Sequence, residues 1–264
     1  MITLGGDPEA FFARDGKVIP AAVVFVENDI LDDRIELDTG HLYVDGADIE
    51  FQPNPSEQPN EVLANITNLI EVACEFADVA ETSLAIVPEL PIDLEWCMDN
   101  PELAVFGCDP DKSIWGEECV PESIDASKHP WRYAGCHLHF GVAENPDFFK
   151  DRVDLTIASF DRTIGLLSLA TSDGLGEQRR QIYGRPGIYR HQPWGIEYRT
   201  PSNTLLANDK LVTAYELGIN VIKDIDTIGP RLKDAVPDEV VLSVLRYGSS
   251  KDAQKLLEVM LACM

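Results

Sequence analysis

The sequence predicts a single α+β domain. Segments with the two-residue alternation of β-strands and segments with the helical spacing of apolar residues both occur along the 264 residues. No internal repeat, low-complexity tract or linker divides them, so one domain over residues 1–264 is the simplest organisation. A hydrophobic content of 45% and a charged content of 25% are ordinary for a globular protein with a large core.

The first third of the chain combines strands with one helix. Alternating apolar residues between turn signals predict strands at residues 3–13, 18–22, 42–52 and 83–87. Asp15-Gly16 joins the first two of them as a hairpin. Apolar residues at helical spacing over residues 60–80 predict an amphipathic helix that covers one face of the sheet.

The rest of the chain is more helical. Residues 88–132 hold six prolines and three tryptophans, which predicts a long irregular region of the kind that covers or binds substrates. Strands are expected at 133–143 and around 195–200. Helices are expected at 151–171 and, at the end of the chain, roughly at 208–227, 237–247 and 250–262.

The charge of the chain is strongly negative, at −25 from 46 acidic and 21 basic residues. Such a surface repels nucleic acid and anionic membranes, so we expect neither as a partner. Solubility or adaptation to a salty cytoplasm explains most of this excess, because a few cation ligands cannot.

The N-terminal sequence and the cysteines favour a cytoplasmic location. No apolar run is long enough to span a membrane, and the first residues lack the features of a signal peptide. None of the six cysteines forms a Cys-x-x-Cys pair, so we expect reduced thiols and no zinc knuckle. Cys108 and Cys136 are expected to serve as small buried residues.

Four short stretches each place two polar groups two residues apart in a strand-like setting. They are Asp7-Pro8-Glu9, Asp48-Ile49-Glu50, His137-Leu138-His139 and Glu197-Tyr198-Arg199. Residues i and i+2 of a strand point to the same face, so each stretch can direct both groups at one site. Carboxylates, imidazoles and a guanidinium on one face suit divalent cations and phosphate.

The first stretch, Asp7-Pro8-Glu9, also has a plainer interpretation as a turn with solvated acidic residues. Pro8 favours an edge or a bulge, where side chains are often turned toward a site. Glu50, between Ile49 and Phe51, is expected to be buried and therefore to need a partner such as a metal. Asp45 lies five positions before Glu50, on the opposite face of a plain strand, unless Gly46 allows a bulge.

The histidine pair and the arginines point to phosphate or metal contact. A lone strand histidine is usually structural, but His137 and His139 form a pair between glycines. Arg179, Arg180 and Arg185 stand out in so acidic a chain, although a loop cluster with acidic neighbours would also explain them. Arg199, two residues from Glu197, is well placed to clamp a phosphate while the glutamate binds the cation.

Together these motifs resemble the glutamine synthetase and glutamate–cysteine ligase superfamily. They are most similar to the compact carboxylate–amine ligases encoded by tailed phages and some prokaryotes. The resemblance covers roughly residues 3–205 and leaves out the helical segment 206–264. The stretches that carry it are Gly5-Gly6-Asp7-Pro8-Glu9, the strand glutamate before Pro53, residues 106–111 with Trp115, Gly135-Cys136-His137-Leu138-His139, residues 179–190 and Glu197-Tyr198-Arg199-Thr200-Pro201-Ser202.

The resemblance implies a glutamine synthetase-like fold and its chemistry. The fold would be a curved antiparallel sheet with helices on its convex face and the active site on its concave face. ATP and two or three Mg²⁺ or Mn²⁺ ions would be used, and a carboxylate and an amine would be joined through an acyl phosphate. A phage-encoded member would work in the host cytoplasm. A homo-oligomer is left open, because this chain is much shorter than glutamine synthetase.

The resemblance also implies roles for individual residues. Glu9 and Glu50 would bind a metal near the acyl acceptor, with Asp45 or Asp48 assisting. Asp7, His137 and Glu197 would bind the metal on the ATP phosphates, although Asp7 stands where larger relatives have glutamate and its shorter reach favours a water-bridged contact. Phosphate or acyl-phosphate contacts would be made by His139, Arg179, Arg180 and Arg199. Apart from the resemblance, the irregular region 88–132 is the candidate for substrate contact and water exclusion, with Asp109 and Asp111 as candidate amine binders.

Two other functions are consistent with the same residues. His-x-His with carboxylates also begins many metal-dependent hydrolase sites, but that function leaves the arginines without a role. A non-catalytic binding protein on a ligase-like scaffold is the other. A ligase needs ATP and Mg²⁺ together, a hydrolase needs a transition metal and no nucleotide, and a binder turns over neither. The carboxylate and the amine are left open as free amino acids, other small molecules, peptide termini or protein side chains.

Overall fold

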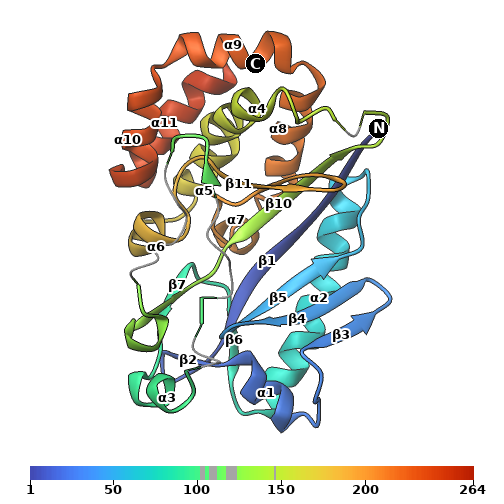
Figure 1. Ribbon diagram of the computed structural model, residues 1–264, viewed down its shortest axis with the longest axis vertical. Helices are drawn as coiled ribbons and strands as arrows, with labels where there is room; N and C mark the ends of the chain where they lie inside the picture. The colour runs from blue at the N-terminus through green and yellow to red at the C-terminus, as the bar shows by residue number, and fades with distance from the viewer. Residues whose placement is uncertain (102–104, 107–111, 117–123, 146) are drawn as a thin grey trace.

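The computed structural model describes residues 1–101, 105–106, 112–116, 124–145 and 147–264. Asp109, Asp111 and Cys108, for which the sequence suggests roles, lie outside the described residues. The described chain mixes strands and helices, and its dominant element is one large antiparallel sheet (Figure 1).

Ten of the described strands form this sheet. They are β1 (Ile2–Arg14), β2 (Lys17–Ile19), β3 (Arg34–Leu37), β4 (Gly40–Asp45), β5 (Asp48–Pro53), β6 (Ser83–Ala85), β8 (Lys112–Ser113), β10 (Cys136–Val142), β11 (Ile188–Gln192) and β12 (Gly195–Tyr198). Their order is β3-β4-β5-β1-β10-β12-β11-β8, and β2 and β6 pair with the end of β1. A small second sheet joins β7 (Glu89–Pro91) to β9 (Trp131–Tyr133).

The helices of the described residues follow from the same periodicities. They are α1 (Ala21–Glu27), α2 (Pro59–Val79), α3 (Leu94–Asp99), α4 (Val153–Phe160), α5 (Leu166–Ala170), α6 (Glu177–Ile182), α7 (Thr204–Ala207), α8 (Leu211–Lys223), α9 (Ile225–Ala235), α10 (Asp238–Tyr247) and α11 (Ser250–Leu261). A π-helical turn, η2 (Asp161–Gly165), joins α4 to α5, and η1 (Ala126–Lys128) is a 3-10 turn. None of the described helices is both long enough and apolar enough to cross a membrane.

The central strands separate an apolar face from a polar one. Leu4, Leu138, Phe140 and Ile196 are fully buried and belong to one core cluster with residues of α2, α4 and α8. Tyr215 of α8 donates a hydrogen bond to the carbonyl of Gly5 at 2.6 Å, which fixes this helix against β1. Since strand residues alternate between faces, the odd-numbered polar residues of β1 lie on the opposite side of the sheet.

Most expected elements are present, with differences at turns. Residues 42–52 do not form one strand: they belong to the hairpin of β4 and β5, in which Asp45 pairs with Asp48 across a two-residue turn. Gly46 has a positive φ of 60° there, a conformation that glycine adopts readily. The helix expected at 208–227 is two helices, α8 and α9, and the helix expected at 151–171 contains the π-helical turn. Cys136 is buried and carries a free thiol.

Candidate functional site

Strand register brings the sequence motifs onto one face of the sheet. Asp7 of β1 lies opposite His137 of β10, and His139 lies opposite Glu197 of β12. On the other side of β1, Glu9 lies opposite Glu50 of β5. Directly opposed residues of antiparallel strands point to the same side, so these side chains converge from four neighbouring strands.

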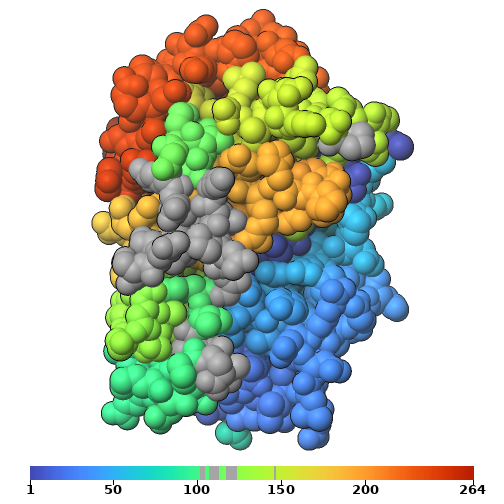
Figure 2. All heavy atoms as spheres, viewed as in Figure 1, coloured from blue at the N-terminus to red at the C-terminus, as the bar shows by residue number. Residues whose placement is uncertain are grey.

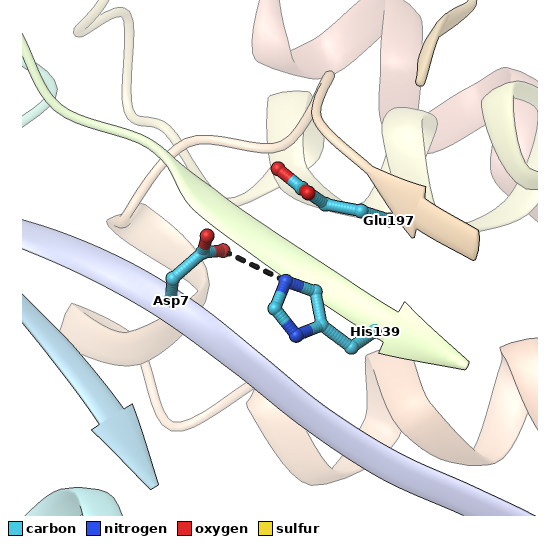
Figure 3. A group of neighbouring side chains, drawn as sticks. All are labelled: Asp7, His139 and Glu197. Carbon is cyan, nitrogen blue, oxygen red and sulfur yellow. Dashed lines mark ion pairs between the residues drawn. The ribbon is translucent and has the colours of Figure 1, made fainter. Parts of the chain in front are cut away.

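The first group of potential cation ligands is formed by Asp7, His139 and Glu197. One ligand atom from each lies within 4.8 Å of the others. His139 Nε2 is 3.2 Å from Asp7 Oδ1, and Figure 3 shows the two side chains directed at each other with Glu197 above them. Two carboxylates and an imidazole make a ligand set suited to Mn²⁺ or Mg²⁺.

The second group of potential cation ligands is formed by Glu9, Asp45 and Glu50, again within 4.8 Å of one another. Asp45 belongs to this group because the chain reverses between β4 and β5. The hairpin places Asp45 on the same face as Glu50 without a bulge. Glu9 is held by hydrogen bonds from the Tyr183 hydroxyl at 2.9 Å and from the backbone N–H of Gly135.

His137 lies between the two groups and Asp48 outside them. His137 Nδ1 is 3.3 Å from Asp7 Oδ1 and 3.8 Å from a carboxylate oxygen of both Glu9 and Glu197. Asp48 is buried, and its charge acts on the Arg132 guanidinium. The structure therefore places His137 as a bridge between the groups and Asp48 as a partner of a buried arginine.

Several liganding atoms of the site have no hydrogen-bond partner among the described residues. They are Asp7 Oδ1, both ring nitrogens of His137 and His139 Nε2, all with almost no exposure to solvent. Their mutual contacts are close, yet none has hydrogen-bond geometry. A buried polar atom without a partner is costly, and a cation in contact with these oxygen and nitrogen atoms would satisfy them.

The charges of the site shift one another's pKa values. Burial raises the pKa of Glu50 well above its ordinary value, and the carboxylates of Asp7, Glu9 and Asp45 raise it further. Burial would also raise the pKa of Asp7, but the adjacent His139 and His137 hold it well below its usual range. The pKa of His139 is raised: burial opposes this, but the Asp7 carboxylate outweighs it. Repulsion from the neighbouring carboxylates thus favours the protonated form of Glu50, and a cation bound in the second group would offset this repulsion.

A cavity of about 810 Å³ opens over both groups. It is lined by residues of β1, by Tyr43, Asp45 and Glu50 of the β4–β5 hairpin, and by Arg190, Gln192, Pro193 and Trp194 of the β11–β12 hairpin. Figure 2 shows these two hairpins, in blue and in orange, on opposite sides of a recess. A cavity of this size accommodates a ligand as large as a nucleotide.

Two arginines reach this cavity, and only one of them was expected. Arg199 lines it and forms an ion pair with Glu197, and both side chains are almost fully buried. Arg190 also lines it, because β11 places this residue opposite Glu197. No role for Arg190 was expected from the sequence, although pairing the strands around the turn at Pro193-Trp194 places it opposite Glu197.

The other predicted arginines do not line the cavity and are held by backbone carbonyls. Arg179 donates hydrogen bonds to the carbonyls of Thr200 and Pro201, at 3.0 and 2.8 Å, and its guanidinium lies over the Tyr183 ring. Arg180 donates to the carbonyls of Leu245 and Gly248, at 3.2 and 3.1 Å. Neither residue lines the cavity. In this structure Arg179 supports the segment after β12, and Arg180 anchors α10.

Comparisons with known proteins add little to this geometry. No family model matches the chain, and no curated protein matches it. A solved structure described as a novel glutamine synthase homolog aligns with 99% of this chain at 12% sequence identity and a TM-score of 0.42. The chain spans 66% of that protein's chain. This TM-score is too low for the likeness to support an inference about fold or chemistry.

Proposed function

We propose that the protein is an ATP-dependent carboxylate–amine ligase. The observation that carries the proposal is the convergence, in one cavity, of two potential cation sites joined by His137 and flanked by Arg190 and Arg199. Cation ligands and guanidinium groups side by side are the arrangement that phosphoryl transfer requires, because charge spreads over the phosphoryl oxygens during the reaction. The motif resemblance to carboxylate–amine ligases agrees with this chemistry.

The residues of the site fit Mg²⁺ or Mn²⁺. The first group would hold an ion against the phosphates, and the second group would hold an ion near the acyl acceptor. A divalent ion bound there supplies neutralisation of phosphate charge. Arg199 and Arg190 act on the same charge from the β11–β12 side, and the Tyr183 hydroxyl keeps Glu9 oriented.

The reaction consists of two transfers. A carboxylate oxygen of the acid substrate attacks the γ-phosphorus of ATP, and ADP leaves. The nitrogen of the amine substrate then attacks the acyl carbon, inorganic phosphate leaves, and an amide forms. The amine loses a proton in the second transfer, and two carboxyl groups of the second group, Asp45 and Glu50, line the cavity where a carboxylate can accept it. The substrates are a small-molecule or peptide carboxylate and amine.

Calorimetry of ATP binding with and without Mg²⁺ tests the proposal. The variants are Glu197→Gln, which removes one ligand charge without changing side-chain size, and Glu258→Gln, a matched change on the exposed surface of α11. Binding should require Mg²⁺, be lost in Glu197→Gln and be unchanged in Glu258→Gln. Release of ADP that depends on an added acid and amine then identifies the substrates.

Other outcomes would favour the alternatives. Failure to bind ATP with or without Mg²⁺ would contradict the ligase proposal, and zinc-dependent hydrolysis without nucleotide would replace it. Magnesium-dependent ATP binding with no turnover of any acid and amine pair would indicate a binding protein.

A further inference from the structure

Trp194 is a large aromatic side chain at the edge of the cavity. It occupies the two-residue turn between β11 and β12, is 44% exposed and lines the cavity. Its ring lies against that of His139, with centroids 4.7 Å apart and planes at 38°. Exposed tryptophan is unusual away from binding surfaces, because leaving so large an apolar surface in water is unfavourable.

The backbone holds Trp194 in place even though its side chain is exposed. The β11–β12 hairpin packs closely over β10 at Gly141. A Cβ added at Gly141 would lie 2.8 Å from the carbonyl oxygen of Trp194, a distance that real Cβ atoms do not show. This close approach fixes the turn against the sheet, so the indole is a positioned surface of the cavity.

The cavity wall around the indole differs from the wall around the cation groups. Besides the carboxylates, His139 and the two arginines, the lining includes Gly141 and Pro193, which adjoin Trp194, and Val142 and Ala143, which follow Gly141 in the chain. His139 belongs to both parts, because its Nε2 contacts Asp7 while its ring contacts Trp194. A ligand that fits both parts has a flat apolar ring joined to an anionic group.

From this arrangement we infer that Trp194 is the stacking platform for the base of the nucleotide. The phosphates lie at the first cation group and at Arg190 and Arg199, and the base lies on the open side of the indole. Every base has a π-face, so an aromatic ring binds it by stacking. The inference rests on the proposed function, since it identifies the part of the same cavity that binds the nucleoside.

The test compares ATP with inorganic tripolyphosphate, which has the phosphates and no nucleoside. The Mg²⁺-dependent affinity of both is measured by calorimetry for the wild type, Trp194→Ala, Trp194→Phe and His191→Ala. His191 is exposed on the same hairpin and does not line the cavity, so it is the matched control. Trp194→Ala should weaken ATP binding about 5- to 150-fold, the range expected for loss of one base–aromatic stack. Tripolyphosphate binding should not change, and Trp194→Phe should recover part of the ATP affinity.

Each other outcome has a distinct meaning. Equal weakening of ATP and tripolyphosphate in Trp194→Ala would show that Trp194 acts only through His139, and would overturn the stacking role. Unchanged ATP affinity in that variant, or a wild type that binds ATP no more tightly than tripolyphosphate, would also overturn it and leave the proposed function standing. A wild type that binds neither ligand would overturn the proposed function itself.

Discussion

Asp161 provides the most exact test of how the site is held together. Its carboxylate is fully buried in the π-helical turn and accepts hydrogen bonds from three separate segments. The donors are the Trp115 indole N–H at 2.8 Å, the Tyr198 hydroxyl at 2.7 Å, the Gly187 N–H at 3.0 Å and, at the longer distance of 3.5 Å, the Thr200 hydroxyl. Tyr198 lies between Glu197 and Arg199, so Asp161 connects the core to the strand that carries both residues.

The substitution Asp161→Asn replaces one carboxylate oxygen with an NH₂ group. The amide keeps the acceptor for Tyr198 and Gly187 when its carbonyl takes the place of Oδ1, and its NH₂ group then faces the Trp115 N–H. One buried hydrogen bond is replaced by two opposed donors, so we expect a loss of about 1–3 kcal/mol in the free energy of unfolding. Asp161→Ala leaves all of these donors without this acceptor and should cost about 3 kcal/mol or more.

Equilibrium unfolding in urea measures these losses, provided that the denaturant dependence stays constant among variants. Asp234→Asn, on the exposed surface of α9, is the matched control and should lie within about 0.5 kcal/mol of the wild type. Trp115→Phe should destabilise the wild type and have little further effect in Asp161→Asn, because the bond it removes is already lost. An Asp161→Asn variant as stable as the control, or additive effects of the two substitutions, would refute this reasoning.

Three further predictions concern the cation groups. Mn²⁺ at roughly 100 times its Kd should stabilise the protein by about 2.7 kcal/mol and raise Tm by roughly 5–11 °C, as measured by calorimetric melting. Asp7→Asn should reduce this shift in Tm, and Glu258→Gln should leave it unchanged. Tyr183→Phe should lower the free energy of unfolding of the metal-free protein by about 1.5–3 kcal/mol, since the charged acceptor Glu9 loses a donor, and urea curves that overlay the wild type would contradict this. Because the pKa of Glu50 is raised well above its ordinary value, cation binding must displace a proton there. Mn²⁺ affinity should therefore increase with pH above the range in which an ordinary glutamate titrates, and titrations of Glu50→Gln should show a weaker dependence.

The polar motifs could be predicted from sequence because strand alternation is local. Asp7 and Glu9, like His137 and His139, share a face whatever the strand packs against. The sequence does not show which strands are neighbours, and this determines that Glu9 meets Glu50 while Asp7 meets His137. The grouping of ligands therefore depends on tertiary structure.

The hairpin of β4 and β5 shows a signal that the sequence contained. Apolar residues fall at even positions, Leu42 and Val44, before Gly46 and at odd positions, Ile49 and Phe51, after it. Within a single strand, the residues on the buried face are either all at even or all at odd positions. The change from even to odd positions therefore indicates a turn. The turn also explains why Asp45 and Glu50 share a face, a result that a single strand reaches only with a bulge.

Arg179 and Arg180 show what sequence reasoning could not supply. They lie in α6, a helix of six residues that is too short for its periodicity to be recognised. Successive residues of a helix point in directions about 100° apart. One guanidinium consequently reaches the carbonyls after β12 and the other reaches the end of α10, and neither enters the cavity.

The apolar face of the sheet sets the geometry of the polar face. Leu4 pairs with Phe140 and Gly6 with Leu138, and burial of these residues against the helices fixes the register of β1 and β10. A slip of one residue would place Asp7 opposite Leu138, so that carboxylates would face the core and leucines would face the cavity. Such a slip would also expose fully buried side chains, each worth roughly 1.5–3 kcal/mol. Hydrophobic burial thus fixes the positions of the cation ligands before a cation binds.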